Sequence, residues 1–96
     1  MARLFDNDPV LEERGGQDRL TRLDTKEMGK RKMSEYLRIG DGAFILIKID
    51  NFEQIKENYG KKIGDIVLRE TADILRSFEQ TDYVCRFDTD EFVLFL

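Results

Sequence analysis

The sequence predicts an α+β fold, with three helices and three strands around one core. Stretches with the 3.6-residue apolar spacing of helices alternate with short continuous apolar runs, which are typical of buried strands. A chain of 96 residues can build one hydrophobic core but not two. An apolar fraction of 41% and a single proline are typical of a folded domain. The predicted order is helix, strand, helix, helix, strand, strand.

The domain is predicted to span residues 18–96, after a linker or N-terminal extension over residues 1–17. The pair Gly15-Gly16 should stop any helix that begins before it.

The first predicted helix has Asp24 as its N-cap and Glu27 three residues later, in capping-box spacing. It should end near Arg38. Its apolar face would comprise Met33, Tyr36 and Leu37.

Residues 43–47 form a continuous apolar run rich in β-branched side chains, which predicts a strand buried on both faces. The strand is expected to continue to Asp50. Because side chains alternate along a strand, Lys48 and Asp50 would then lie on the same side.

Two helices are predicted next. Asn51 should cap a short helix that carries Phe52 and Tyr59 as core residues, and Gly60 should end it. The second helix has apolar residues at 3.6-residue spacing, namely Ile63, Ile66, Val67, Ile74, Leu75 and Phe78.

The last predicted unit is a hairpin, with strands over residues 83–87 and 92–96 joined by a turn at residues 88–90. Its second strand is entirely apolar. We expect the burial of both faces to need elements outside this chain, since an uncovered apolar strand is an aggregation template.

Composition excludes several classes of protein. The net charge of −4 argues against a nucleic-acid partner. The single cysteine, Cys85, cannot form an internal disulfide, which favours a cytoplasmic location, and it is expected to be a small core residue. No apolar run approaches the roughly 20 residues that a membrane span needs, so no membrane insertion by this segment is expected.

Polar residues gather near the predicted strand ends and the hairpin turn. Carboxylates converging there could bind a nucleotide-linked Mg²⁺. Acidic residues at turns are also common as solvated features, so the pattern by itself leaves both interpretations open. The residues are Lys48, Asp50, Asp65, Asp88, Asp90 and Glu91.

Five segments in order resemble the motifs of one known family. Residues 18–23 are similar to its opening motif D-x-L-T-x-L, and residues 45–52 to the strand and turn I-D-I-D-x-F. Residues 58–68 resemble N-D-x-x-G-H-x-x-G-D-x-x-L, and residues 82–86 and 90–92 match the end of a signature hairpin. The family is the GGDEF domain of bacterial diguanylate cyclases.

The resemblance implies a fold related to nucleotide cyclases and polymerase palms, ferredoxin-like, with helices packed on a central sheet. It also implies that the domain is C-terminally incomplete here. Enzymes of the family condense two GTP molecules into cyclic di-GMP across a dimer, with help from Mg²⁺. Mg²⁺ and GTP are therefore the cofactor and substrate if the chain is active.

Carried over by resemblance, the first metal-ligand aspartate of the family falls on Lys48, which cannot bind a cation while charged. The backbone carbonyl ligand falls on Ile49, and the metal-binding and catalytic acid on Asp90, with Glu91 beside it as a vestigial catalytic residue. The two signature glycines fall on Asp88 and Thr89. A β-branched residue at position 89 would resist the positive φ that glycine permits.

The guanine-recognising positions fall on Lys56, in place of an asparagine, and on Asp65, which is retained. Asp65 would serve equally well in the first turn of a helix. The inhibitory motif R-x-x-D keeps Asp82 but has Glu79 in place of its arginine, which would repel the anionic product.

We therefore expect a degenerate GGDEF-type domain with a regulatory, scaffolding or GTP-sensing role and no required cofactor. The alternative is an active diguanylate cyclase. Lys48 is predicted to reach between Asp90 and Asp50 in place of a metal. Self-association as a homodimer and contact with other signalling domains are the expected interactions.

Overall fold

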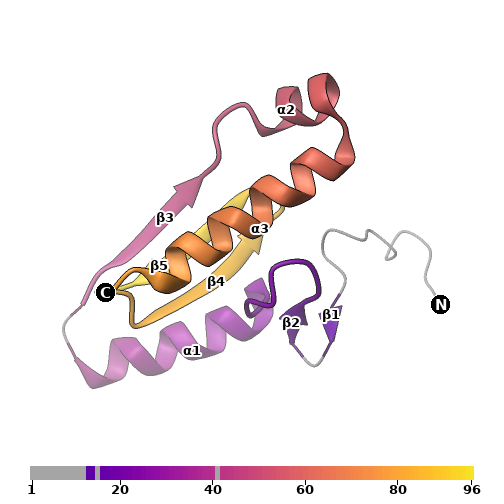
Figure 1. Cartoon of the computed structure of the whole chain (residues 1–96). Helices are drawn as coiled ribbons and strands as arrows, with labels where there is room; N and C mark the ends of the chain where they lie inside the picture. Colours follow the sequence, from indigo (N-terminus) through magenta and orange to yellow (C-terminus); the bar gives the residue numbers. More distant parts are fainter. Residues whose placement is uncertain (1–12, 15, 41) are drawn as a thin grey trace.

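The computed structural model describes residues 13–14, 16–40 and 42–96, so most of the predicted linker lies outside the described residues. The elements are β1 (Glu13–Arg14), β2 (Gln17–Asp18), α1 (Lys26–Ile39), β3 (Phe44–Lys48), α2 (Phe52–Tyr59), α3 (Lys61–Ser77), β4 (Tyr83–Asp88) and β5 (Glu91–Phe95) (Figure 1). The predicted α-β-α-α-β-β order is confirmed. The short antiparallel pair of β1 and β2 was not predicted.

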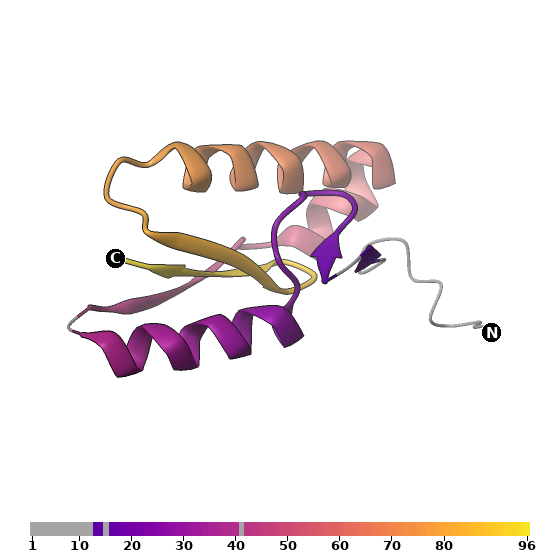
Figure 2. The ribbon, with the colours of Figure 1, turned by 90° about the horizontal axis from the view of Figure 1, so that it is seen from below.

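The central sheet has three strands in the order β3-β5-β4, and both pairings are antiparallel. Figure 2 shows the sheet between two layers, with α1 on one face and α3 on the other. The register places Lys48 opposite Glu91, at the end of the sheet where the β4–β5 hairpin turns. The candidate functional site lies at this end of the sheet.

Strand β5 lies at the centre of the sheet, and its residues from Phe92 to Phe95 are all buried. Phe92 and Leu94 belong to the core cluster beneath α3, together with Leu68 and Ala72. On the opposite face, the ring of Phe95 stacks on Tyr36 of α1 at a centroid distance of 4.4 Å. The expectation that this strand needs cover from outside the chain is therefore wrong, because α1 and α3 supply it.

Strand β3 was predicted to be buried on both faces, and this prediction is also wrong. It pairs only with β5 among the described strands and forms an edge of the sheet. Ile45 and Leu46 remain 40% and 59% exposed. The run of apolar residues is the same as in a central strand, so only the pairing order reveals the difference.

Helix α3 buries a different stripe from the predicted one. Its buried residues are Gly64, Leu68 and Ala72, which follow an i, i+4, i+8 row. Most of the predicted apolar face is exposed instead: Ile63, Ile66, Ile74 and Phe78. Gly64 faces α2, where a Cβ atom would fall 2.8 Å from Lys56 Cγ, whereas Leu68 and Ala72 belong to the core cluster. Leu37 and Tyr59, also expected in the core, are exposed as well.

The start of α1 differs from the predicted capping box. Thr25 is the N-cap, without a side-chain cap hydrogen bond. The Asp24 carboxylate instead accepts a hydrogen bond from the Tyr83 hydroxyl at 2.6 Å and lies 3.4 Å from Lys32 Nζ. The predicted boundaries at Asn51 and Gly60 are confirmed, and both residues adopt positive φ.

Gly29 allows α1 to lie directly against β4. A Cβ atom at this position would fall 2.5 Å from Cys85 Sγ, and Cys85 is fully buried as predicted. We expect Gly29→Ala to destabilise the fold by about 1–3 kcal/mol through overpacking, although alanine is the better helix former. Chemical denaturation measures this loss. The double variant Gly29→Ala with Cys85→Ala should recover part of it, and a stabilised Gly29→Ala protein would contradict the prediction.

The stability of the fold should decrease at alkaline pH because of the buried thiol. Burial, with a smaller contribution from the charge of Asp24, raises the pKa of Cys85 to about 11, whereas a thiol in an unfolded chain ionises near pH ~8.5. Between these values the unfolded chain binds fewer protons than the native one, so stability falls as pH rises. Burial and the hydrogen bond to Asp24 also raise the pKa of Tyr83 above its usual value. That group adds to the loss at still higher pH.

Urea midpoints at about pH 7.5 and about pH 9.5 measure the effect. Cys85→Ala should show a smaller difference between the two midpoints than the native chain does. Equal differences would mean that another group causes the pH dependence.

Candidate functional site

The candidate site lies where the end of β3 meets the hairpin turn between β4 and β5. The backbone N–H of Ile49 donates to the carbonyl of Asp90 at 3.0 Å, which ties the turn to the residue after β3. Lys48 pairs with Glu91 in the strand register. The predicted juxtaposition of the hairpin carboxylate with the end of the first strand is thus present.

Lys48 contacts two acidic side chains at this point. Its Nζ lies 3.5 Å from Asp90 Oδ2 and 4.0 Å from Glu91 Oε2. The expected contact with Asp50 is wrong. The strand ends at Lys48, so side-chain alternation does not extend to Asp50, and Glu91 is the second carboxylate instead. The Lys48 side chain is 60% exposed, so we expect its ion pairs to contribute little to the stability of the fold.

The donor set at this position does not fit a divalent cation. Mg²⁺ is bound by oxygen ligands, whereas residue 48, where the resemblance implies the first ligand, carries an ammonium group. Within the described part of the chain, no group of three or more His, Cys, Asp or Glu side chains is arranged to hold a metal ion.

The two predicted guanine positions each have a partner on their own helix. Lys56 Nζ lies 3.4 Å from Glu53 Oε2 and 5.3 Å from the centre of the Phe52 ring. The Lys56 stem crosses to α3, since a Cβ atom at Gly64 would fall 2.8 Å from its Cγ. Asp65 Oδ2 accepts a hydrogen bond from Lys61 Nζ at 3.0 Å.

Thr89 occupies the hairpin turn without the backbone geometry of glycine. The only described residues other than glycine with positive φ are Arg22 and Asn51. Thr89 therefore does not adopt positive φ, and its backbone N–H donates a hydrogen bond to Asp88 Oδ1 at 2.8 Å. The turn has therefore adapted to the two side chains at the glycine positions.

Asp82, which the resemblance places in the inhibitory motif, is exposed just before β4. It lines a pocket of about 310 Å³ to which Arg22, Lys32 and Arg76 also contribute. Sequence reasoning did not find these basic residues, because they come from three separate segments.

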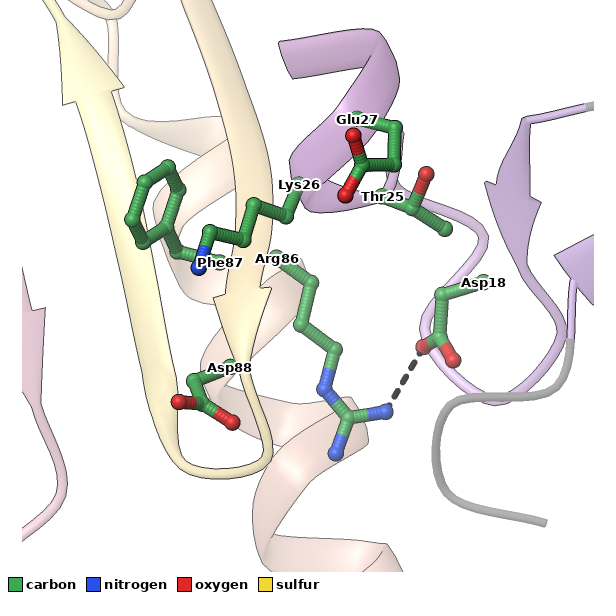
Figure 3. Close-up of a pocket in the computed structure, with 7 residues that line it drawn as sticks. All are labelled: Asp18, Thr25, Lys26, Glu27, Arg86, Phe87 and Asp88. Carbon is green, nitrogen blue, oxygen red and sulfur yellow. Dashed lines mark hydrogen bonds and ion pairs between the residues drawn. The ribbon is translucent and has the colours of Figure 1, made fainter. Parts of the chain in front are cut away.

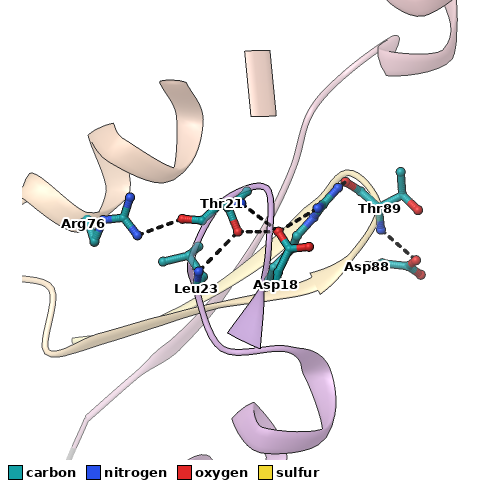
Figure 4. A network of polar contacts seen from close by, with 7 residues as sticks. Asp18, Thr21, Leu23, Arg76, Asp88 and Thr89 are labelled. Carbon is teal, nitrogen blue, oxygen red and sulfur yellow. Dashed lines mark hydrogen bonds and ion pairs between the residues drawn. The ribbon is translucent and has the colours of Figure 1, made fainter. Parts of the chain in front are cut away.

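A buried polar network connects the opening motif to the hairpin (Figure 4). Arg86 Nη1 donates to Asp18 Oδ2 at 2.8 Å, and both side chains are almost fully buried. Asp18 also accepts hydrogen bonds from the backbone and hydroxyl of Thr21. Arg86 Nη2 donates to the carbonyl of Thr89 at 2.6 Å, so the network supports the hairpin turn.

Arg76 of α3 extends the network, donating to the carbonyl of Thr21 at 3.0 Å. In the sequence, both ends of this network appear only as letters of the matched motifs. An acid in a turn and an arginine in an apolar strand were the available signals.

A pocket of about 250 Å³ lies beside this network, between the start of α1 and β4 (Figure 3). Lys26 and Phe87 both line this pocket, and Lys26 Nζ lies 5.1 Å from the centre of the Phe87 ring. The residues that line this pocket are Asp18, Thr25, Lys26, Glu27, Arg86, Phe87 and Asp88. Of the polar residues that the sequence offered for a Mg²⁺ site, only Asp88 is among them.

The sheet order, the helix layers and the hairpin at the strand end define a domain of the nucleotide-cyclase type, related to polymerase palms. The sequence model of the family "Diguanylate cyclase, GGDEF domain" matches residues 16–96. The chain belongs to the GGDEF family.

Individual relatives agree with this assignment. Diguanylate cyclase DgcS of Shewanella oneidensis is 41% identical over 56 residues, which are 57% of this chain and 19% of that protein. The GGDEF domain of TpbB (YfiN) from Pseudomonas aeruginosa superposes with a TM-score of 0.77 at 30% identity, covering 83% of this chain and 50% of that one.

Diguanylate cyclase SiaD of Pseudomonas aeruginosa, solved with its activator SiaC, has a TM-score of 0.74 at 28% identity. The match covers 96% of this chain and 38% of SiaD. The chain thus spans half or less of each of these relatives. Among its described residues, no helix is long and apolar enough to cross a membrane.

Proposed function

We propose that this chain is a degenerate GGDEF-type domain of a cyclic di-GMP signalling protein, with a regulatory, scaffolding or GTP-sensing role and without cyclase activity. The supporting observation is the Lys48 ammonium at the end of β3, within 4.0 Å of both hairpin carboxylates. An ammonium at this point competes with the divalent cation that GTP condensation needs.

The other substituted positions support the same proposal. Lys56 replaces the asparagine that recognises guanine in the family, and its amine is paired with Glu53. Glu79 replaces the arginine of the inhibitory motif and is exposed. An acidic side chain in place of that arginine disfavours an anionic cyclic dinucleotide.

Exposed apolar side chains support a role in contacts with other polypeptides. They lie on the edge strand β3 and on the outer side of α3. SiaD was solved in complex with an activator protein. We propose that this domain likewise acts through contacts, either with a second copy or with other signalling domains of the same cytoplasmic system.

Incubation of the full-length protein with GTP and Mg²⁺, followed by chromatography of the products, tests the proposal. We expect no cyclic di-GMP above the level of an Asp90→Asn variant, with a GGDEF-type diguanylate cyclase as positive control. Product above that level would establish the alternative, an active cyclase. A parallel titration with GTP separates a GTP-sensing role, in which GTP binds without turnover, from a scaffolding role without GTP binding.

A further inference from the structure

We infer that the Lys48 ammonium is a built-in counter-cation for the hairpin carboxylates, and that it alone keeps this end of the sheet from binding a divalent cation. An oxygen ligand at position 48 would complete a site with Asp90 and Glu91. This deepens the proposed function, because it concerns the same position, but it is a claim about ion binding and not about turnover.

The two carboxylates are held in place independently of Lys48. Glu91 is the first residue of β5 and pairs across to β3 in the strand register. Asp90 is fixed through its carbonyl, which accepts the hydrogen bond from the Ile49 N–H. The Arg86 guanidinium holds the neighbouring Thr89 carbonyl at 2.6 Å. A change of side chain at position 48 therefore leaves the backbone that presents both acids intact.

The side chain of residue 48 also starts beside the two acids. Lys48 lies directly opposite Glu91 in the antiparallel ladder, where facing side chains are neighbours. Its flexible stem brings one ammonium within 4.0 Å of both carboxylates. A shorter acidic side chain at this position would place a third oxygen ligand beside the same two acids, and three such ligands suit a hard divalent cation.

Replacing Lys48 by an acidic residue should change the affinity for a divalent cation strongly and the stability of the fold only slightly. Lys48, Asp90 and Glu91 are 60%, 21% and 26% exposed, so the ion pairs are partly solvated. Replacing Lys48 by aspartate changes the local charge by two units, next to where the cation would lie. At effective dielectric constants near a protein surface, this change should raise divalent affinity by about tenfold or more.

The test uses Mn²⁺ as the probe, measured by electron paramagnetic resonance of the free ion and by paramagnetic broadening of backbone amide signals. We expect the native chain to show no selective broadening at Asp90 and Glu91, and Lys48→Asp to show it with about tenfold or more tighter Mn²⁺ binding. Adding Asp90→Asn to Lys48→Asp should abolish the gain. Arg38→Asp makes the same change of charge in the last turn of α1 and should leave binding unchanged.

Two further variants guard against a folding artefact. Lys48→Asn supplies a neutral oxygen and should give an intermediate gain, whereas Lys48→Met removes the ammonium without supplying a ligand and should keep an unfolding midpoint close to that of the native chain. Selective Mn²⁺ broadening at Asp90 in the native chain would overturn the inference. So would failure of both Lys48→Asp and Lys48→Asn to bind Mn²⁺ more tightly while folded. Either result is independent of whether the protein makes cyclic di-GMP.

Discussion

Replacing Asp18 with asparagine should lower the free energy of unfolding by about 3–5 kcal/mol, the range observed when one partner of a buried ion pair is removed. The side chains of Arg86 and Asp18 are 0% and 1% exposed, with 2.8 Å between Nη1 and Oδ2. Without the carboxylate, the buried guanidinium would lose the ion pair with Asp18. The hydrogen bonds that Asp18 accepts from Thr21 would be weakened as well.

Urea denaturation of the native chain and the variant measures this effect. Asp73→Asn is a matched control, since Asp73 also pairs with an arginine, Arg76, at 2.6 Å, but both side chains are exposed. Its cost should be about 0–1 kcal/mol. If the two variants lose similar amounts of stability, burial does not determine the contribution of the Asp18–Arg86 pair.

Phe92→Ala should lower the free energy of unfolding by a similar amount, about 3–5 kcal/mol. Phe92 is 0% exposed at the centre of the sheet and belongs to the core cluster with Leu68, Ala72 and Leu94. Truncation would remove apolar surface from the core and leave a cavity that its rigid neighbours on β3 and β4 cannot fill.

Phe78→Ala provides the comparison for this prediction. Phe78 is the C-cap residue of α3 and is 54% exposed, although the helical spacing of the sequence placed it in the core. Its replacement should change stability by about 0.5 kcal/mol or less. Thermal or chemical unfolding of both variants measures the difference, and a large loss for Phe78→Ala would show that its exposed ring is covered in solution.

Local chemistry made several features predictable. Asn51 and Gly60 both tolerate positive φ, so the boundaries of α2 follow from residue type. The polar turn between two apolar runs predicted the β4–β5 hairpin, and the contact of Lys48 with Asp90 follows from placing that hairpin beside β3. The capping of α1 was not predictable in this way, because the Asp24 carboxylate accepts a hydrogen bond from Tyr83, a residue 59 positions further along the chain.

The sequence by itself determined the order of the elements and the residues at the strand end, including an ammonium at the position where the resemblance implies a carboxylate. Only the tertiary structure decided which strand is central and which face of α3 is buried. A continuous apolar run predicts a buried strand but carries no record of its neighbours, so β3 and β5 looked alike although β5 has a partner on each side. The same limit applies to Asp18 and Arg86, which are 68 residues apart. Their pairing depends on long-range packing, which local propensity does not encode.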